Sequence, residues 1–203
     1  MSINCKVTSK NSWNIPISDG ELNYWPNLFE NQNCNAIFTE LLELPWQQNQ
    51  VRIFNNWYLT PRLESLHGEI ETTYSYSGQI LKTKVLTPLL SELKSLVEEL
   101  TGHSFNVVLV NYYRNGQDSN GWHADNEPEL GQNPVIASLS FGVERRFDLK
   151  HKFSGDQVQI QLKNGSLLLM SGPIQHFWKH QIAKSKKVLE GRINLTFRRI
   201  LKP

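Results

Sequence analysis

The chain has 203 residues, a formal net charge of +2 and 39% hydrophobic residues. This length allows one substantial domain, and the hydrophobic share supports a packed core and excludes wholesale disorder. No apolar run approaches the roughly 18 residues of a membrane helix, and the first residues show no secretory signal. We therefore expect one domain over residues 1–203, monomeric, without a membrane partner, and cytoplasmic (nuclear if the source is eukaryotic).

Two helices are predicted in the first half of the chain. Residues 1–30 are polar and typical of an irregular extension, and residues 35–46 place Ile37, Phe38, Leu41 and Leu42 on one face of a helix. In the second helix, Thr87 suits the N-cap, Pro88 the first turn and Gly102 the end. Its predicted buried stripe consists of Leu89, Leu93, Leu96, Val97 and Leu100.

From Phe105 onward the pattern changes to short strands separated by turn residues. The candidate strands are residues 105–113, 135–142, 145–151, 157–162, 165–172, 180–184 and 191–200. Strands that follow helices favour an α+β, mainly β, fold whose body is a sandwich or a barrel.

One face of the last strand is polar. Alternation puts Arg192, Asn194, Thr196 and Arg198 on one side of it, and in the same way Asn111 and Tyr113 share a face of strand 105–113. An ordinary half-exposed strand would show the same pattern, so the strand alone does not distinguish a pocket from a solvated face.

The stretch "NGWHADNEPEL" places His123 and Asp125 two residues apart in a turn-like segment. In an extended chain both side chains point the same way and could contact one ion. Two histidines and one carboxylate form the facial triad that binds Fe(II) and leaves positions open for a co-substrate and oxygen. A loop histidine beside a solvated aspartate would give the same sequence pattern. Only a third ligand elsewhere in the chain would distinguish a metal site from such a loop.

The third ligand must be another histidine, because Cys5 and Cys34 lack metal-ligand neighbours and exclude a Cys/His zinc protein. Two cysteines are also too few for a disulfide framework, which favours a reducing compartment. The remaining histidines are His103 at a helix end, His67 and His151 in polar loops, His176 after a turn and His180 at the start of a strand.

Five motifs, taken in their order along the chain, resemble those of the AlkB family of iron- and 2-oxoglutarate-dependent nucleic-acid dealkylases, in particular its animal-type branch. They are "NYYRNGQDSNGWHADNEPEL", "IASLSFG", "GSLLLM", "WKH" and "RINLTFR", and the similarity covers roughly residues 50–200. The resemblance implies a double-stranded β-helix (jelly roll) in residues 105–203, with the helices bracing one sheet. It also implies an N-terminal extension and helix in residues 1–50 and a nucleotide-recognition lid in residues 51–85.

The resemblance further implies a ligand set. Fe(II) would be bound by His123, Asp125 and His180, because the family's last histidine follows an aromatic residue by two and precedes an aliphatic residue by two, as His180 does. Arg198 would pair with the distal carboxylate of 2-oxoglutarate, whose planar fork a guanidinium matches. The rest of the co-substrate pocket would be formed by Asn111, Tyr113, Arg192 and Asn194.

The lid implied by the resemblance holds a flipped base. Tyr76 would stack on that base opposite His123, with Tyr74 and Ser77 lining the pocket. In "RIFNNWYLTPR", Phe54 would fill the gap left in a duplex and Arg62 would reach towards the substrate. Phe54 as a simple core residue remains the alternative.

One departure from the family concerns the range of lesions. Close relatives carry an aspartate directly after the liganding aspartate, where this chain has Asn126, followed by the matching Glu127. Both residues are candidates to contact the base. A neutral amide both donates and accepts hydrogen bonds, so the preference for a positively charged methylated base stays open.

The implied activity is oxidative dealkylation of 1-methyladenine and 3-methylcytosine in DNA, with RNA as a further substrate. O₂ and 2-oxoglutarate would be consumed, and formaldehyde, succinate and CO₂ released. Two alternatives remain. A 2-oxoglutarate oxygenase acting on a protein or small molecule would not need the lid at residues 74–77, and a non-catalytic nucleic-acid-binding module would lack a ligand or the co-substrate arginine.

Overall fold

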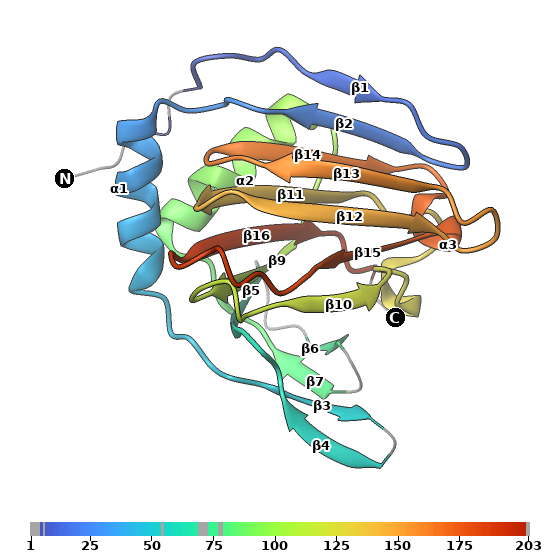
Figure 1. Ribbon diagram of the computed structural model, residues 1–203. Coiled ribbons are helices and arrows are strands. Elements are labelled where there is room, and N and C mark those ends of the chain that lie inside the picture. Colours follow the sequence, from blue (N-terminus) through green and yellow to red (C-terminus); the bar gives the residue numbers. More distant parts are fainter. Residues whose placement is uncertain (1–4, 6, 54, 69–72, 77–78, 202–203) are drawn as a thin grey trace.

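The computed structural model describes residues 5, 7–53, 55–68, 73–76 and 79–201, with residues 52–53, 73–76 and 79–81 described by their backbone alone (Figure 1). Its helices are α1 (Asn31–Leu42), α2 (Pro88–Thr101) and α3 (Ile174–Phe177), with a 3₁₀ turn at Pro128–Leu130. The strands are β1 (Trp13–Ile15), β2 (Glu21–Trp25), β3 (Gln50–Ile53), β4 (Asn56–Leu59), β5 (Leu63–Gly68), β6 (Thr73–Tyr76), β7 (Gln79–Lys82), β8 (Lys84–Val85), β9 (Val107–Tyr113), β10 (Asn120–His123), β11 (Ile136–Gly142), β12 (Arg145–His151), β13 (Gln157–Leu162), β14 (Ser166–Ser171), β15 (Trp178–Ile182) and β16 (Arg192–Arg198).

Two facing sheets form the body of the molecule (Figure 1). The larger sheet has the order β1-β2-β14-β11-β16-β9-β5-β8, and the smaller one has the order β10-β15-β12-β13. Apolar side chains from both sheets fill the space between them, among them Leu109 of β9, Leu168 of β14 and Leu149 of β12. This arrangement confirms the predicted jelly roll.

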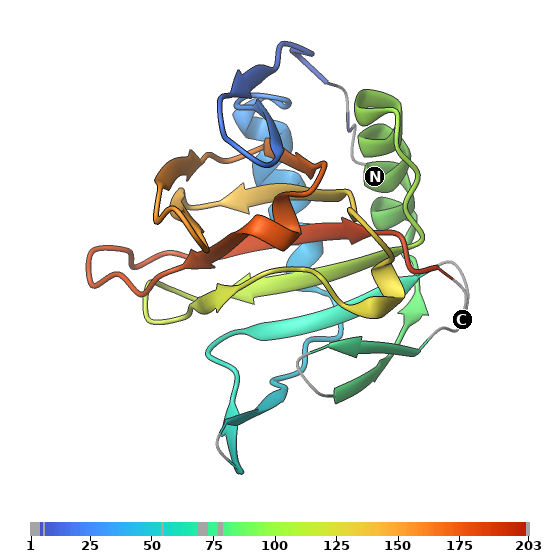
Figure 2. The ribbon, with the colours of Figure 1, turned by 90° about the vertical axis from the view of Figure 1, so that its right-hand side faces the viewer.

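Both long helices pack on the face of the larger sheet that points away from the smaller one (Figure 2). Their buried side chains lie in one apolar cluster with the outward face of β16, which comprises Ile193, Leu195 and Phe197. Burial of this face fixes the register of β16, because a shift by one residue would turn its polar side chains onto the helices. The helices thereby hold the polar face of β16 toward the space between the sheets.

The boundaries of α2 agree with the prediction. Thr87 Oγ1 accepts a hydrogen bond from the backbone N–H of Leu90 at 3.2 Å, and Gly102 ends the helix with φ +71°. Such an N-cap stabilises a helix by about 1 kcal/mol. The buried apolar face of α2 is narrower than predicted, since Leu96 and Leu100 are only partly buried.

Two short hairpins, β3–β4 and β6–β7, lie below β10 in the view of Figure 1. Except for Gln50, both fall inside residues 51–85, the range assigned to the nucleotide-recognition lid. The same range also contains β5, which is a buried strand of the larger sheet and pairs with β9 over six residues from Leu63 to Gly68. His67 therefore lies on a strand and not in a polar loop, and His151 likewise ends β12.

The prediction of an irregular segment at residues 1–30 is wrong for residues 13–15, which form β1, and for residues 21–25. Residues 21–25 form β2, which pairs with β14 and buries Leu22 and Tyr24. Two apolar residues in alternation were too weak a signal within a polar stretch, and the partner strand supplies the stabilising contacts.

Within the described residues, none of the helices combines the length and the apolar character that a membrane span requires.

Candidate metal centre and co-substrate pocket

Three side chains meet where β10 and β15 run side by side. His123 ends β10, Asp125 follows two residues later, and His180 lies directly opposite His123 in the strand pairing. One ligand atom from each of the three lies within 4.8 Å of the others. A set of two histidines and one carboxylate suits Fe(II) and leaves coordination positions open. The structure thus brings together the three residues that the family resemblance implies as iron ligands.

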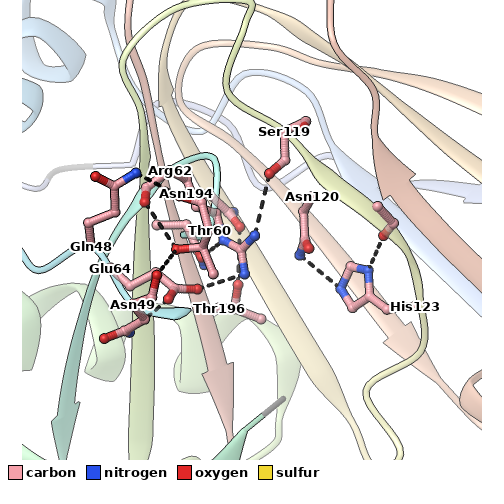
Figure 3. A network of polar contacts seen from close by, with 12 residues as sticks. Gln48, Asn49, Thr60, Arg62, Glu64, Ser119, Asn120, His123, Asn194 and Thr196 are labelled. Atoms are coloured by element: carbon pink, nitrogen blue, oxygen red, sulfur yellow. Dashed lines mark hydrogen bonds and ion pairs between the residues drawn. The ribbon is translucent and has the colours of Figure 1, made fainter. Parts of the chain in front are cut away.

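The ring of His123 is oriented by its own strand (Figure 3). Nδ1 lies 2.7 Å from the carbonyl oxygen of Gly121, and Nε2 lies 3.1 Å from Asn120 Nδ2. The carbonyl can only accept, so Nδ1 carries the proton and Nε2 keeps its lone pair. A second-nitrogen contact of this kind is typical of metal-ligating histidines. His123 therefore presents the nitrogen that a metal requires.

Protonation states in the trio also favour metal binding. Burial, together with the neighbouring His123, lowers the pKa of His180 to about 3, and Asp125 partly opposes this shift. Burial likewise lowers the pKa of His123, partly opposed by Asp125. For Asp125, burial alone would raise the pKa, but Arg198, His180 and His123 outweigh it and hold the pKa well below its usual range. Two neutral imidazoles and one carboxylate result, which is the form that binds a divalent metal.

Asp125 is fixed by two further residues. Arg198 Nη2 donates to Asp125 Oδ1 at 2.8 Å, and Gln175 Oε1 accepts the backbone N–H of Asp125 at 3.0 Å. The other carboxylate oxygen, Oδ2, lies 3.8 Å from His180 Nε2. Asp125 thereby offers one oxygen to a metal while the other is held by a cation.

His176 does not belong to this trio. It lies on α3, where its Nε2 accepts the backbone N–H of Asn133 at 3.4 Å. Of the two late histidines in the sequence, only His180 has a ligand atom within reach of His123 and Asp125.

The polar face of β16 lines a cavity beside the trio. All seven residues of β16 are buried, so the alternative of a half-exposed strand is wrong. The predicted co-substrate residues that line the cavity are Asn111, Tyr113, Arg192, Asn194 and Arg198. Strand alternation put the β16 residues on one face, and the family resemblance implied that this face lines a pocket.

Arg192 is the most unusual group in the cavity. Only 1% of it is exposed, its Nη2 donates to Ser140 Oγ at 2.9 Å, and its guanidinium carbon lies 5.4 Å from the centre of the Tyr113 ring. Its Nε and Nη1 are buried and make no hydrogen bond to the described residues. Burial lowers the pKa of Arg192 to about 10. A buried cation with free donors is costly unless an anion binds to it.

Arg62 does not reach towards the substrate as predicted, because its guanidinium is bound inside the protein (Figure 3). Its Nη2 lies 2.7 Å from Glu64 Oε1, and its Nε donates to Asn111 Oδ1 at 3.0 Å. Glu64 Oε2 in turn accepts from Asn49 Nδ2 at 2.7 Å. Both members of the ion pair are buried, with 3% and 2% exposed for Arg62 and Glu64. The network joins the base of the β3–β4 hairpin to the co-substrate pocket.

The remaining predicted residues are placed to different extents. Asn126 is exposed and Glu127 is half-buried, directly after Asp125. The backbone of Tyr74 and Tyr76 lies on β6. Phe54 and Ser77 lie outside the described residues.

Sequence reasoning missed several supporting residues. Ser138 and Ser140 of β11 hydrogen-bond Asn194 and Arg192, and their alternation with Leu139 could have indicated a polar face. Gln175 gave no signal, because it lies on the short helix α3, whose position beside Asp125 depends on the tertiary fold.

Comparisons with known proteins agree with this geometry. The profile of the 2OG-Fe(II) oxygenase superfamily matches residues 21–198. The alpha-ketoglutarate-dependent dioxygenase alkB homolog 3 of Bos taurus is 40% identical over 185 residues, which cover 86% of this chain and 64% of the relative. The DNA oxidative demethylase ALKBH2 is 41% identical in Bos taurus and 38% in Homo sapiens, each match covering 86% of this chain and 67% and 71% of the relative. The chain belongs to the AlkB family.

The superfamily whose profile matches is that of the 2OG-Fe(II) oxygenases, and the His–Asp–His trio fits the iron in its name. The chain spans about two thirds of the length of several relatives. The solved structure of OsALKBH1 superposes with a TM-score of 0.62 over 92% of this chain and 99% of that chain, at 15% identity. This likeness supports the AlkB-type jelly roll and no more than the fold.

Proposed function

We propose that this chain removes N-methyl groups from 1-methyladenine and 3-methylcytosine in DNA, and also in RNA. The reaction consumes O₂ and 2-oxoglutarate and releases formaldehyde, succinate and CO₂. The single observation that carries the proposal is a His–Asp–His trio sharing one cavity with buried arginines, in a chain about 40% identical to proteins named as demethylases. The protein acts as a monomer, in the cytoplasm or, in a eukaryote, in the nucleus.

The residues present fit the iron and the co-substrate. His123, Asp125 and His180 hold the metal, which together with 2-oxoglutarate supplies the oxidising chemistry when both are bound. The unpaired donors of Arg192 suit a carboxylate, so we assign the distal carboxylate of 2-oxoglutarate to Arg192 in place of Arg198. Arg198 is already bound to Asp125 and acts on the metal ligand. The groups that hydrogen-bond the rest of the co-substrate are Asn111, Tyr113 and Asn194.

The base-binding side is assigned by family resemblance together with position. Tyr76 stacks on the extruded base, with Tyr74 and Ser77 beside it, and Phe54 fills the gap in a duplex. A base must leave its stack to reach a metal inside a jelly roll, which costs a few kcal/mol. Stacking on an aromatic side chain can offset roughly 1–3 kcal/mol of that cost.

Lesion selectivity is assigned to the two residues after the metal-ligand aspartate. Asn126 and Glu127 follow Asp125 directly, so both can contact the Watson–Crick edge of a base held near the metal. The Asn126 amide is neutral and accepts as well as donates, which favours a broader range of lesions than a carboxylate would.

The test is turnover of a defined lesion. The protein is loaded with Fe(II) without oxygen, then given 2-oxoglutarate, air and an oligonucleotide with one 1-methyladenine or 3-methylcytosine. Mass spectrometry should show loss of one methyl group that depends on 2-oxoglutarate. Succinate formation with no change in any methylated oligonucleotide would contradict the proposal and point to a protein or small-molecule substrate.

A further inference from the structure

A second cleft lies on the outer face of the smaller sheet, across the sheet from the metal trio. It has a volume of ≈ 320 Å³ and is lined by Trp122, Lys150, His151, Lys152 and Lys179. We call this group the cationic cleft. Successive residues of a strand point to opposite faces, so Trp122 and Lys179 face outward while their neighbours His123 and His180 face the metal site. The cationic cleft is thus separate from the co-substrate pocket.

The lysines are arranged unfavourably for the protein alone. Lys150 and Lys179 are exposed and lie directly opposite one another in the β12–β15 pairing. Like charges in that position destabilise a sheet. Lys152 adds a third ammonium, whose pKa is lowered by burial and by Lys179. Among the described residues, none of the three lysines has an ion pair with a carboxylate, and Asp19 Oδ2 lies 3.3 Å from His151 Nε2.

An exposed tryptophan completes the cationic cleft. Trp122 is 43% exposed, although an indole of its size is normally well buried. Lys152 Nζ is held by the carbonyl oxygens of Gln175 and His176 at 3.0 and 2.7 Å, so one ammonium has a fixed position. Fixed cations beside an open aromatic face match a phosphodiester backbone with a base that stacks.

The position of the cleft indicates which part of a nucleic acid it would meet. β10 is an edge strand of the smaller sheet, and the β3–β4 and β6–β7 hairpins lie below it in the view of Figure 1. A strand whose damaged base enters beside His123 can therefore continue around this edge to Trp122, the preceding residue. No part of the smaller sheet blocks that route, because β10 has no strand partner on its outer side among the described residues.

We propose that the cationic cleft binds the phosphodiester backbone of the substrate strand beyond the damaged base, with one base stacked on Trp122. This inference rests on the proposed function and extends it from the lesion to the nucleotides beside it.

The test compares two double variants of equal charge. Lys150→Ala/Lys179→Ala removes two cleft lysines, and Lys163→Ala/Lys186→Ala removes two exposed lysines elsewhere. Binding of a labelled, methylated single-stranded oligonucleotide is measured by fluorescence anisotropy over a range of salt, with Fe(II) and 2-oxoglutarate present and oxygen excluded. Each phosphate contact contributes about 0.7 to the slope of log K against log salt for a single strand. The cleft double variant should lower this slope by about 1.4 relative to the control double variant.

Trp122→Ala provides a second, independent measurement. It should weaken binding of the same oligonucleotide by roughly fivefold or more, without changing the salt slope, because stacking is not ionic. A methylated nucleoside, which has no neighbouring base to stack on Trp122, should bind to this variant as it binds to wild type.

The failure of the inference can be told apart from failure of the proposed function. If wild type demethylates the oligonucleotide but both double variants have the same salt slope, the proposed role of the cationic cleft is overturned and the proposed function stands. If wild type neither binds nor demethylates methylated oligonucleotides, both are overturned.

Discussion

Arg198 Nη2 donates to Asp125 Oδ1 at 2.8 Å, and both side chains are almost completely buried, with 3% of each exposed. The bond joins a cation at the end of β16 to the carboxylate of the metal trio. One carboxylate oxygen of Asp125 is thereby bound to the guanidinium, and the other oxygen remains available to a metal. Arg198 is thus a positioning residue for the metal site.

Arg198→Lys should weaken metal binding by roughly 10- to 100-fold, as expected when a partner of a metal ligand is changed. A lysine offers a point charge and no planar fork, so the carboxylate can rotate. Mn(II) titration of the apoprotein, followed by tryptophan fluorescence, measures this loss without turnover. If the metal affinity is unchanged and the KM for 2-oxoglutarate is raised, Arg198 would bind the distal carboxylate of 2-oxoglutarate, as the family resemblance implies.

Arg192→Lys should have the opposite profile. The KM for 2-oxoglutarate should rise by roughly tenfold or more, since a bidentate contact to a carboxylate is lost, while the Mn(II) affinity should stay close to that of wild type. The matched control is Arg146→Lys, an exposed arginine on β12 whose guanidinium pairs with Asp148. Equal KM values for Arg192→Lys and Arg146→Lys would remove Arg192 from the co-substrate site.

The positions of these two arginines show where sequence reasoning ends. Alternation along β16 was enough to put Arg192 and Arg198 on one face, because the opposite face is uniformly apolar and must pack on the helices. Which arginine lies beside Asp125 depends on where the loop after β10 passes, and that loop is held by Gln175, far away in sequence. In the same way, residues 21–25 form β2 within a polar stretch because pairing with the distant strand β14 stabilises it.

Only one of the two late histidines should be essential. His180→Ala should abolish turnover, whereas His176→Ala should retain most of it, because His176 bonds to the backbone of Asn133 and lies outside the trio. His123→Ala and Asp125→Ala should be as inactive as His180→Ala. Formaldehyde release from methylated oligonucleotide is the measurement, and an inactive His176→Ala beside an active His180→Ala would refute the ligand assignment.

Acid should destabilise the fold partly through His67. This residue is 2% exposed, its Nδ1 lies 2.9 Å from the carbonyl oxygen of Val85, and burial lowers its pKa. The unfolded chain binds a proton near pH 6.5, where the folded chain does not, so stability present above that pH falls as the pH is lowered through it. Thermal unfolding of the metal-free protein at pH 7.5 and 5.5 should show a smaller difference in Tm for His67→Gln than for wild type. An equal difference would show that His67 does not contribute.

The buried pair of Arg62 and Glu64 should matter for co-substrate affinity as well as for stability. Glu64→Gln leaves the Arg62 cation uncompensated, which should lower the free energy of unfolding by about 3–5 kcal/mol. Arg62→Met/Glu64→Leu removes both charges together and should recover most of that loss, because well-packed apolar residues often replace a buried pair without cost. Chemical denaturation of the three proteins measures this.

The double variant then separates positioning from folding. Asn111 Oδ1 accepts from Arg62 Nε in wild type, and without that donor the Asn111 amide is no longer held toward the cavity. We therefore expect Arg62→Met/Glu64→Leu to be folded, to bind Mn(II) normally and to have a KM for 2-oxoglutarate raised by roughly five- to tenfold, the loss of about one hydrogen bond. A folded double variant with the KM of wild type would show that the pair supports the β3–β4 hairpin alone and leaves Asn111 unaffected.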